Sequence, residues 1–414
     1  MVSASGTKTG GIYRGREMKK IVEEKIREKI HDYQSPFFIY SFETIKEKIQ
    51  LLKQVFQNRF EVFCSMKANS CPALLKQLKT QDVNIEVCSK GELEEALHAG
   101  FTSERIIFLG PGKSQRELEY AIRSNVSCIV VESKQEIKKI EEVVKMKVDE
   151  KKPIRIIIRI NPAIMNQGAK LQMTGGATQF GIQMDDMEEA IEIVRSSEYL
   201  QLYGFHVYYG SMITDADVLL GNFKMIFQVV SKLVSDYHLD ISFIDFGGGF
   251  GETALEEDQP LDWNKVQEGI QELILEYESC FPRTMRFAIE SGRFLMLHSG
   301  YYVCKVLRTS VKDGKGFAVL DGGIHHISTL TGFGSWARKN YPFELIQENE
   351  CNETAVYDIW GPNSTKSDLL GKNLELPLLD KDTFVVFINT GAYMKNVSPS
   401  YFSGREVAKE YVIE

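Results

Sequence analysis

The sequence predicts an α/β protein, with a parallel, TIM-type (β/α)8 barrel followed by a C-terminal all-β domain. Up to Glu290, eight short apolar stretches alternate with amphipathic helical stretches, as expected for strands buried on both faces of a parallel sheet. After Glu290 the chain becomes β-rich, with Gly, Pro and Asn turns and little helical pattern. The length of 414 residues also exceeds one ordinary domain. An open, doubly wound sheet is the alternative for the first part.

The barrel elements follow one another in a regular order. The expected strands are Val62–Ser65, Asn84–Cys88, Arg105–Leu109, Cys128–Glu132, Ile154–Ile160, Leu202–Tyr208, Ile241–Phe246 and Met285–Glu290. The helices expected between them, from apolar residues spaced three and four apart, include Lys90–Ala99, Gln115–Ser124, Lys134–Met146, Asp186–Ser196, Val218–Tyr237 and Val266–Cys280. This alternation is typical of (β/α)8 barrels.

The remaining segments define the expected domain limits. Strands are expected at Tyr301–Leu307, Gly316–Leu320, Val356–Trp360 and Phe384–Asn389, and an early strand at Phe37–Tyr40 could join them. Residues 17–33 carry a charged helical pattern. We therefore expect a flexible leader over 1–16, a barrel over 42–292, and a β domain formed by 17–41 and 293–414.

Composition restricts the partners and the compartment. The net charge is −8 and the sequence contains no isolated basic block, so we expect no nucleic-acid partner. No uninterrupted apolar run approaches the roughly 18 residues of a membrane span, so we expect no membrane partner. Seven cysteines, an odd number without metal-type spacing, predict reduced thiols in a cytoplasmic protein and no metal site.

Chemically active side chains follow the expected strands at their C-terminal ends, where (β/α)8 enzymes carry their active sites. Lys67 follows the first strand, although lysine is rarely buried without a partner. Glu86, Glu132, Arg159, His206 and Tyr208 come at later strand ends, and Glu290 ends the eighth strand. The ordinary alternative for Lys67 is a side chain whose amine extends into water.

A second group of residues predicts an anion site. The turn Gly247-Gly248-Gly249 would let backbone N–H groups approach a phosphate, and Arg293 adds a fixed charge nearby. A tight turn, and an ion pair of Glu290 with Arg293 or Arg159, are the alternatives. A lysine, a phosphate cradle and a carboxylate facing a ring nitrogen are together the parts of a pyridoxal phosphate site.

An ordered set of motifs from about Ser35 to Arg405 resembles the fold-type III pyridoxal-phosphate decarboxylases, the group of the ornithine, arginine and diaminopimelate decarboxylases. The matching segments are 65–69 (SMKAN), 87–93 (VCSKGEL), 108–113 (FLGPGK), 159–162 (RINP), 179–182 (QFGI), 206–211 (HVYYGS), 247–249 (GGG), 290–293 (ESGR), 361–362 (GP) and 391–393 (GAY). The resemblance implies the alanine racemase-like barrel, pyridoxal 5'-phosphate as cofactor, and a homodimer with shared active sites.

The resemblance also implies a role for each matching residue. Lys67 would hold the cofactor covalently, and Glu290 would keep its ring nitrogen protonated. Related alanine racemases have an arginine at the position of Glu290, so the carboxylate favours decarboxylation over racemisation. The phosphate would be held by Ser211, Gly248, Gly249, Gly292, Arg293 and Tyr393, and further cofactor contacts would come from Arg159, His206 and Tyr208. Tyr393 and the 361–368 loop would reach the partner subunit's site. Substrate contacts would come from Thr365, Asp368 and Phe402.

Three positions depart from the family pattern. Tyr208 stands where most members have a histidine stacked on the cofactor ring, and tyrosine stacks but carries no positive charge. Ser364 stands where a catalytic cysteine helps to control protonation of the α-carbon. Thr365 replaces the acid that holds the distal amine of a diamino substrate. Lys67, with a pKa lowered by burial, is then the expected proton donor, and His206 and a water held by a catalytic Ser364 are the alternatives.

The sequence therefore predicts a decarboxylase that removes the α-carboxylate of an amino acid or an amino-acid derivative, free or carrier-tethered. The segments 289–293 and 321–326 are similar to decarboxylases of specialised biosynthetic pathways, such as the butirosin-pathway enzyme that acts on a glutamyl group on an acyl carrier protein. A racemase or a decarboxylation-dependent transaminase is the first alternative. A non-catalytic regulator of the same fold is the second.

Overall fold

The structure is a computed structural model that describes residues 20–147, 152–162, 171–172, 179–252, 260–328, 340–348 and 352–414. The chain forms two compact units. The barrel unit runs from Ile45 to Leu295, and the β unit contains the chain before Ile45 and from Met296 onward. The expected leader, 1–16, lies outside the described residues.

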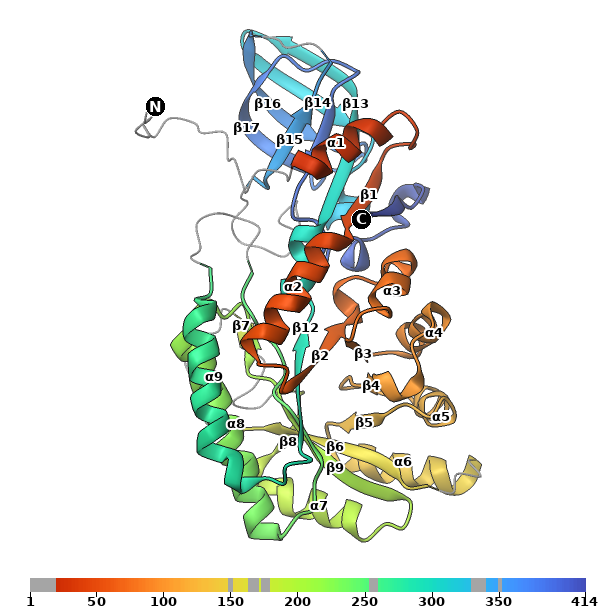
Figure 1. Cartoon of the computed structure of the whole chain (residues 1–414). Helices are drawn as coiled ribbons and strands as arrows, with labels where there is room; N and C mark the ends of the chain where they lie inside the picture. Colours follow the sequence, from red (N-terminus) through yellow and green to blue (C-terminus); the bar gives the residue numbers. More distant parts are fainter. Residues whose placement is uncertain are drawn as a thin grey trace. The chain divides into compact units, whose positions relative to one another are not determined.

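The barrel unit contains all eight expected strands in one closed parallel sheet (Figure 1). Its strands are β2 (Phe60–Ser65), β3 (Asn84–Val87), β4 (Ile106–Phe108), β5 (Cys128–Val131), β6 (Ile154–Asn161), β9 (Leu200–Val207), β11 (Phe243–Asp245) and β12 (Arg286–Ser291). Neighbours in sequence pair in parallel around the ring, β12 pairs with β2, and β5 pairs with β6. This closure confirms the barrel and excludes an open sheet.

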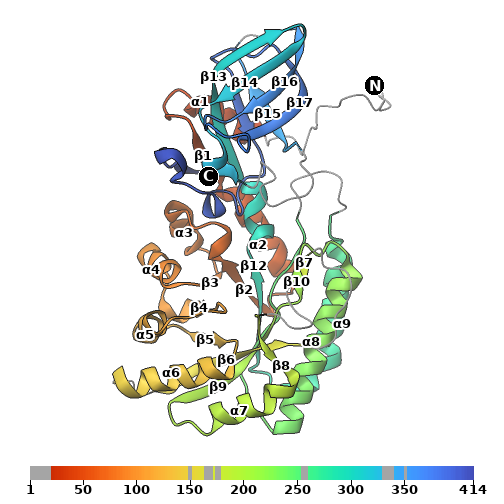
Figure 2. The same cartoon turned by 180° about the vertical axis from the view of Figure 1, so that it is seen from behind.

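Helices follow the strands along the barrel (Figures 1 and 2). They are α2 (Phe42–Val55), α3 (Pro72–Leu78), α4 (Lys90–Ala99), α5 (Gln115–Arg123), α6 (Lys134–Lys147), α7 (Met187–Arg195), α8 (Ala216–Tyr237), α9 (Trp263–Tyr277) and α10 (Arg293–Met296). Short strands β7 (Leu171–Gln172) and β10 (Gly210–Ser211) pair with each other, and β8 (Ile182–Gln183) pairs with β6. Local sequence sets several helix ends, since Ser89 and Ser114 cap the N-termini of α4 and α5.

An apolar cluster built from strands around the ring fills the inside of the barrel. Its buried members are Phe63, Ile107, Leu109, Cys128, Val130, Ile157, Tyr203, Phe243 and Ala288. Burying one large apolar side chain contributes roughly 1.5–3 kcal/mol, so this packing holds the strand ends in fixed positions.

Helix α8 contains an 18-residue stretch with a mean hydropathy of 1.3, so its length and composition alone would let it cross a membrane. The same helix lies beside α9 in the barrel unit and buries Leu219, Phe223, Ile226, Phe227 and Val230 (Figure 1). Packing in this unit therefore explains its apolar composition.

The β unit is built on one long strand, β13 (Gly300–Lys312), which pairs with three others. The sheet order is β15 (Phe343–Ile346), β18 (Phe384–Phe387), β13, β14 (Lys315–Leu320), β16 (Thr354–Trp360) and β17 (Leu369–Pro377). The early strand β1 (Phe37–Ser41) joins this sheet, antiparallel to β13 and parallel to β19 (Lys409–Ile413). The sequence did not indicate β15, β17 or β19.

Helix α1 (Lys20–Lys29) supplies a helical layer to the β unit, which also contains the short helix α11 (Ile324–Ile327). Val22 and Ile26 of α1 are buried with Phe37 and Ile39 of β1 in one core. Short 3₁₀ helices complete the two units at Met66–Ala68, Ser103–Arg105, Met184–Asp186, Glu278–Cys280, Leu297–Ser299, Lys395–Val397 and Phe402–Gly404.

Candidate active site

Lys67 lies in the 3₁₀ turn directly after β2, at the C-terminal end of the barrel. Its Nζ donates to Oε1 of Glu86 at 2.7 Å, and its side chain is 45% exposed whereas that of Glu86 is fully buried. Glu86 reaches it because β3 lies beside β2, with Glu86 in register with Ser65. The amine is thus held at the barrel mouth by a carboxylate of the neighbouring strand.

Glu86 is the centre of a small polar network. Its second oxygen accepts a hydrogen bond from Ser65 Oγ, and Cys88 Sγ donates to Oε1 at 3.3 Å. Burial opposes ionisation, but the charge of Lys67 and these hydrogen bonds outweigh it and lower the pKa of Glu86. Glu86 is therefore a carboxylate at neutral pH.

The pKa of Lys67 differs from the expectation that burial would lower it. Desolvation does act in that direction, but the charge of Glu86, with smaller contributions from Cys88 and Glu290, raises the pKa of Lys67 well above its ordinary value. The expectation was wrong because an acid on the adjacent strand outweighs burial. In the absence of a cofactor, Lys67 therefore keeps its proton.

Arg159, near the end of β6, is buried against a second carboxylate. Its Nη1 donates to both oxygens of Glu132 at 3.1 Å, and Glu132 also accepts the N–H of Gly181. The guanidinium carbon lies 4.7 Å from the centre of the Phe180 ring and 5.9 Å from that of Tyr208. This pairing with Glu132 replaces the alternative ion pair of Arg159 with Glu290.

Glu290, in β12, is buried beside His206 of β9, with 3.4 Å between Oε1 and Nε2. Burial, together with the negative charges of Glu86 and Asp245, raises the pKa of Glu290 well above its ordinary value. Burial and the positive charges of Arg159 and Lys67 lower the pKa of His206, so its ring is neutral. Oε1 of Glu290 has no hydrogen-bond partner among the described residues.

The Gly247-Gly248-Gly249 turn passes close to the neighbouring strand ends. A Cβ on Gly248 would overlap the carbonyl oxygen of Glu290, and one on Gly249 would overlap that of Gly210. Gly247 and Gly249 also have φ angles of 63° and 92°, which favour glycine. Glycine is thus required here for the backbone to run between two strand ends.

The other expected cofactor residues of the barrel unit follow its last strands. The hydroxyl of Tyr208 lies 2.7 Å from Ser211 Oγ, and both side chains are half-buried. Gly292 and Arg293 follow β12 directly and are also half-buried. Lys113, another residue that follows a strand, is instead buried and bonded to Glu136 and to the carbonyls of Gly110 and Val130, so it stabilises the loop.

The remaining expected site residues belong to the β unit. In the 361–368 loop Ser364 is exposed and Thr365 is half-buried, with Thr365 Oγ1 accepting the N–H of Ser367 at 3.2 Å. Asp368 is fully buried and accepts from the Ile324 N–H and from the backbone and side chain of Asn363 at 2.6–2.8 Å. These contacts favour a structural role for Asp368 over the substrate contact that the resemblance implied.

Tyr393 and Phe402 lie further along the β unit. Tyr393 is half-buried with a φ of 57°, which is uncommon for an aromatic residue, and Phe402 is 42% exposed. Their roles toward cofactor and substrate stay predictions.

Two acids at strand ends of the barrel mouth, Glu86 and Glu132, touch the expected site residues, although the sequence alone gave neither of them a role. Both end a strand that is otherwise apolar, and an acid in such a place needs a partner. That signal, combined with the pairing of β2 with β3 and of β5 with β6, could have matched Glu86 with Lys67 and Glu132 with Arg159.

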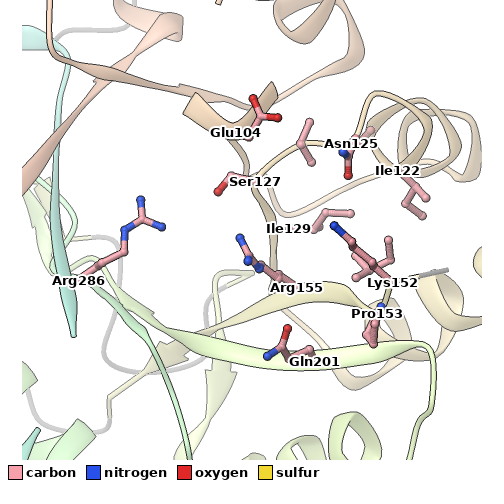
Figure 3. Close-up of a pocket in the computed structure, with 13 residues that line it drawn as sticks. Glu104, Ile122, Asn125, Ser127, Ile129, Lys152, Pro153, Arg155, Gln201 and Arg286 are labelled. Carbon is pink, nitrogen blue, oxygen red and sulfur yellow. The ribbon is translucent and has the colours of Figure 1, made fainter. Parts of the chain in front are cut away.

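A cavity of about 580 Å³ lies at the opposite, N-terminal ends of the barrel strands (Figure 3). Arg155, Lys152 and Arg286 line it, with Gln201, Asn125, Ser127 and Glu104 among their neighbours. Arg286 is already paired with Glu61 and bonded to the hydroxyl of Tyr203, and Arg155 stacks on the Tyr203 ring at 4.8 Å. Arg286 and Arg155 therefore pack against Tyr203 at the N-terminal end of the barrel core.

The residues at the C-terminal ends fit a pyridoxal phosphate. Lys67 offers an amine at the mouth, the glycine turn runs beside Glu290 as backbone without side chains, and Glu290 has a buried oxygen without a partner among the residues that the structure describes. A buried polar atom without a partner is costly, and a protonated ring nitrogen would satisfy it.

Comparisons with known proteins give the same assignment. The family described as "Pyridoxal-dependent decarboxylase, pyridoxal binding domain" matches residues 42–296. The L-glutamyl-[BtrI acyl-carrier protein] decarboxylase of Niallia circulans is 34% identical over 376 residues, 90% of this chain and 87% of that protein. The 2-[(L-alanin-3-ylcarbamoyl)methyl]-2-hydroxybutanedioate decarboxylase of Staphylococcus aureus is 28% identical, covering 87% and 90% of the two chains.

A solved structure extends the likeness to both units. Diaminopimelate decarboxylase from Helicobacter pylori, complexed with L-lysine, superposes with a TM-score of 0.81 at 26% identity, covering 94% of each chain. The enzyme class and the cofactor expected from the sequence are thereby confirmed. The chain belongs to the pyridoxal-dependent decarboxylases.

Proposed function

We propose that this enzyme removes the α-carboxylate from an amino acid, or a derivative of one, whose far end carries no positive charge. The observation that carries the proposal is Thr365, which stands where the resemblance expects an acid to hold a distal amine. The Thr365 hydroxyl is itself occupied locally by the N–H of Ser367. A neutral or acidic substrate, free or tethered to a carrier, needs no such acid.

Two of the named relatives support this substrate class, whereas the diaminopimelate decarboxylase acts on a diamino acid. One acts on a glutamyl group carried by an acyl-carrier protein, and another on a substituted hydroxybutanedioate. Each substrate belongs to that relative, and for this chain they indicate which compounds to try first. A specialised biosynthetic pathway is the setting that we propose.

Each residue at the barrel mouth has a separate proposed role toward the cofactor. Pyridoxal phosphate supplies a ring that stabilises negative charge at the α-carbon. In the proposal Lys67 holds the cofactor, Glu290 keeps a proton at the ring nitrogen, and Tyr208 packs against the ring. The phosphate is bound by Ser211, Gly248, Gly249, Gly292, Arg293 and Tyr393, and Arg159 and His206 complete the site.

Lys67 is also the proposed acid for the α-carbon. An aliphatic hydroxyl is far too weak an acid to donate a proton at neutral pH, which excludes Ser364 as a direct donor. Once released from the cofactor, the amine of Lys67 stays beside Glu86, whose charge keeps the amine protonated. That proton is available at the barrel mouth, where the reacting carbon would lie.

We propose a cytoplasmic homodimer whose sites are shared. The cysteines that the structure describes are all free thiols, which supports a reducing compartment. Tyr393 lies in the β unit, whereas Lys67 lies in the barrel unit. Mixing inactive Lys67→Ala subunits with inactive Tyr393→Ala subunits should restore part of the activity through one intact site per heterodimer. No recovery after verified subunit exchange would contradict shared sites.

The substrate proposal is tested by carbon dioxide release from L-glutamate, a glutamyl-pantetheine thioester, L-lysine, L-ornithine and L-arginine. Because a charge-assisted hydrogen bond is worth roughly 1.5–3 kcal/mol, we expect the three basic amino acids to be about ten- to a hundredfold poorer in kcat/KM. Thr365→Asp should improve lysine and ornithine by a similar factor, whereas the uncharged control Thr365→Asn should not. Wild-type turnover of ornithine or lysine comparable to the best substrate would refute the proposal.

The same assay separates the other catalytic possibilities. Carbon dioxide release without racemised amino acid excludes a racemase, and an amine product in place of a carbonyl product excludes a decarboxylation-dependent transaminase. The relatives named above are all decarboxylases. The presence of Lys67, Arg293 and Tyr393 together argues against a non-catalytic regulator.

A further inference from the structure

Asp245 is a buried acid next to Glu290 for which the reaction described above has no use. It ends β11, between β9 and β12, and is in register with His206 on one side and Ala288 on the other. Its side chain has no exposure to solvent. One oxygen, Oδ1, accepts the N–H of Gly247 at 2.8 Å and so holds the start of the glycine turn.

The side chain of Asp245 also belongs to a cluster of titratable groups. Ligand atoms of Asp245, Glu290 and His206 all lie within 4.8 Å of one another. Oδ2 of Asp245, Oε1 of Glu290 and both ring nitrogens of His206 are buried without a hydrogen-bond partner among the described residues. Two ionised carboxylates only accept hydrogen bonds, so they cannot satisfy each other unless one of them carries a proton.

The charges around the pair disfavour a second negative charge. The negative charges of Glu86 and Glu61 disfavour ionisation of Asp245, and Glu86 also disfavours ionisation of Glu290, whereas the positive charges of Lys67 and Arg159 oppose this at Glu290 with smaller effects. Burial is the largest cause, and it raises the pKa of Asp245 to about 7, against the opposing effect of the Gly247 N–H. Two carboxyl groups so close in a buried site titrate as a pair.

We infer that Asp245 is a positioning residue for the cofactor, and that its carboxyl group forms a buried dyad with the carboxyl group of Glu290. Without a cofactor the two carboxyl groups share one proton. With the cofactor bound, that proton passes from Glu290 to the ring nitrogen, leaving two carboxylates opposite one ring cation with no change in total charge. The inference deepens the role proposed for Glu290.

The test measures the affinity of pyridoxal phosphate for the apoenzyme as a function of pH, in the wild type and in Asp245→Asn. Asparagine keeps an oxygen for the Gly247 N–H but cannot ionise. One unit above the Asp245 pKa of about 7, we expect the variant to bind the cofactor about ten- to a hundredfold more weakly. Below that pKa the difference should shrink by up to tenfold per pH unit, because the wild type must then lose a proton from Asp245 on binding.

Two controls isolate this effect. Asp215→Asn changes another aspartate that accepts backbone N–H groups, at the start of α8, and should leave the affinity unchanged at every pH. If Asp245→Asn does not fold, calorimetry of the wild type in buffers of different ionisation enthalpy gives a second measurement. Cofactor binding should then release up to one proton per site below the Asp245 pKa, and none above it.

The outcomes distinguish this inference from the proposed role of Glu290. A variant that is uniformly weaker at all pH values would show that Asp245 only shapes the glycine turn, and would overturn the dyad. Stoichiometric zinc in the purified protein, lost in Asp245→Asn, would also overturn it, because three such donors could bind a cation. If Glu290→Gln leaves cofactor affinity and rate unchanged, the role of Glu290 itself is wrong.

Discussion

Two buried carboxylates, Glu290 in the barrel unit and Asp368 in the β unit, have opposite surroundings. Oε1 of Glu290 has no partner among the described residues, and burial raises the pKa of this acid well above its ordinary value. Asp368 is equally buried, but it accepts three hydrogen bonds from Ile324 and Asn363 within its own unit. Glu290 therefore keeps one oxygen available for the proposed contact with a ligand, whereas the hydrogen bonds of Asp368 hold its loop.

The difference shows how a buried acid in this chain can be assigned a role. An unpaired buried polar group costs stability, and proteins retain such groups where function needs them. The barrel unit collects several around Glu290, including His206 and Asp245. The β unit uses its acid, together with Arg405 on Asn363 and Pro362, to fix the 361–368 loop that carries Ser364 and Thr365.

The largest expected effect comes from the barrel unit. Lys67→Ala removes the amine that would hold the cofactor, so the rate should fall by several orders of magnitude. Lys90→Ala, which changes a half-buried lysine whose side chain is also 45% exposed and is paired with Glu94, is the matched control and should keep its activity. Steady-state kinetics with saturating pyridoxal phosphate measure both variants. A Lys67→Ala enzyme whose rate stays within tenfold of the wild-type rate would contradict the proposed role of Lys67 in the barrel unit.

A smaller effect is expected at Asp368. Asp368→Ala leaves the buried N–H groups of Ile324 and Asn363 without an acceptor, at a cost of about 1–3 kcal/mol each in the free energy of unfolding. The exposed Asp382→Ala should change that free energy by no more than about 0.5 kcal/mol. Denaturant unfolding measures both. An Asp368→Ala protein of normal stability with a selective loss of substrate affinity would restore the substrate role.

The sequence was most informative where one local pattern sufficed. The eight barrel strands are mostly apolar along their length, which made them recognisable. Their C-terminal ends then indicated candidate site residues, namely Lys67, Arg159, His206 and Glu290. Three β-unit strands were missed because they are short or contain residues that disfavour strands, such as Gly371 and Asn373 in β17. The raised pKa of Lys67 and the hydrogen bonds that occupy Asp368 depend on the folded structure. The spacing of apolar residues in the sequence does not reveal such contacts.

The smallest expected effect concerns Ser364, which is exposed in the loop that Asp368 holds. Because the pKa of Lys67, the proposed acid, is raised well above its ordinary value, we expect Lys67 to give up its proton less readily than a thiol would, so that some turnovers end in a carbonyl product. Ser364→Cys adds a thiol with an ordinary pKa of about 8.5 and should lower the fraction of carbonyl product. Product analysis over prolonged turnover measures it, with Ser367→Cys in the same loop as control. A strict one-to-one ratio of amine to carbon dioxide in the wild type, unchanged in Ser364→Cys, would contradict this account.

The central claim is that the C-terminal ends of the barrel strands bind pyridoxal phosphate on Lys67. Borohydride reduction of the purified holoenzyme, followed by protease digestion and mass spectrometry, locates the modified lysine directly. We expect one phosphopyridoxyl group per chain, on the peptide that contains Lys67, and none on it in Lys67→Ala. A stoichiometric adduct on any other lysine would contradict the assignment of the active site.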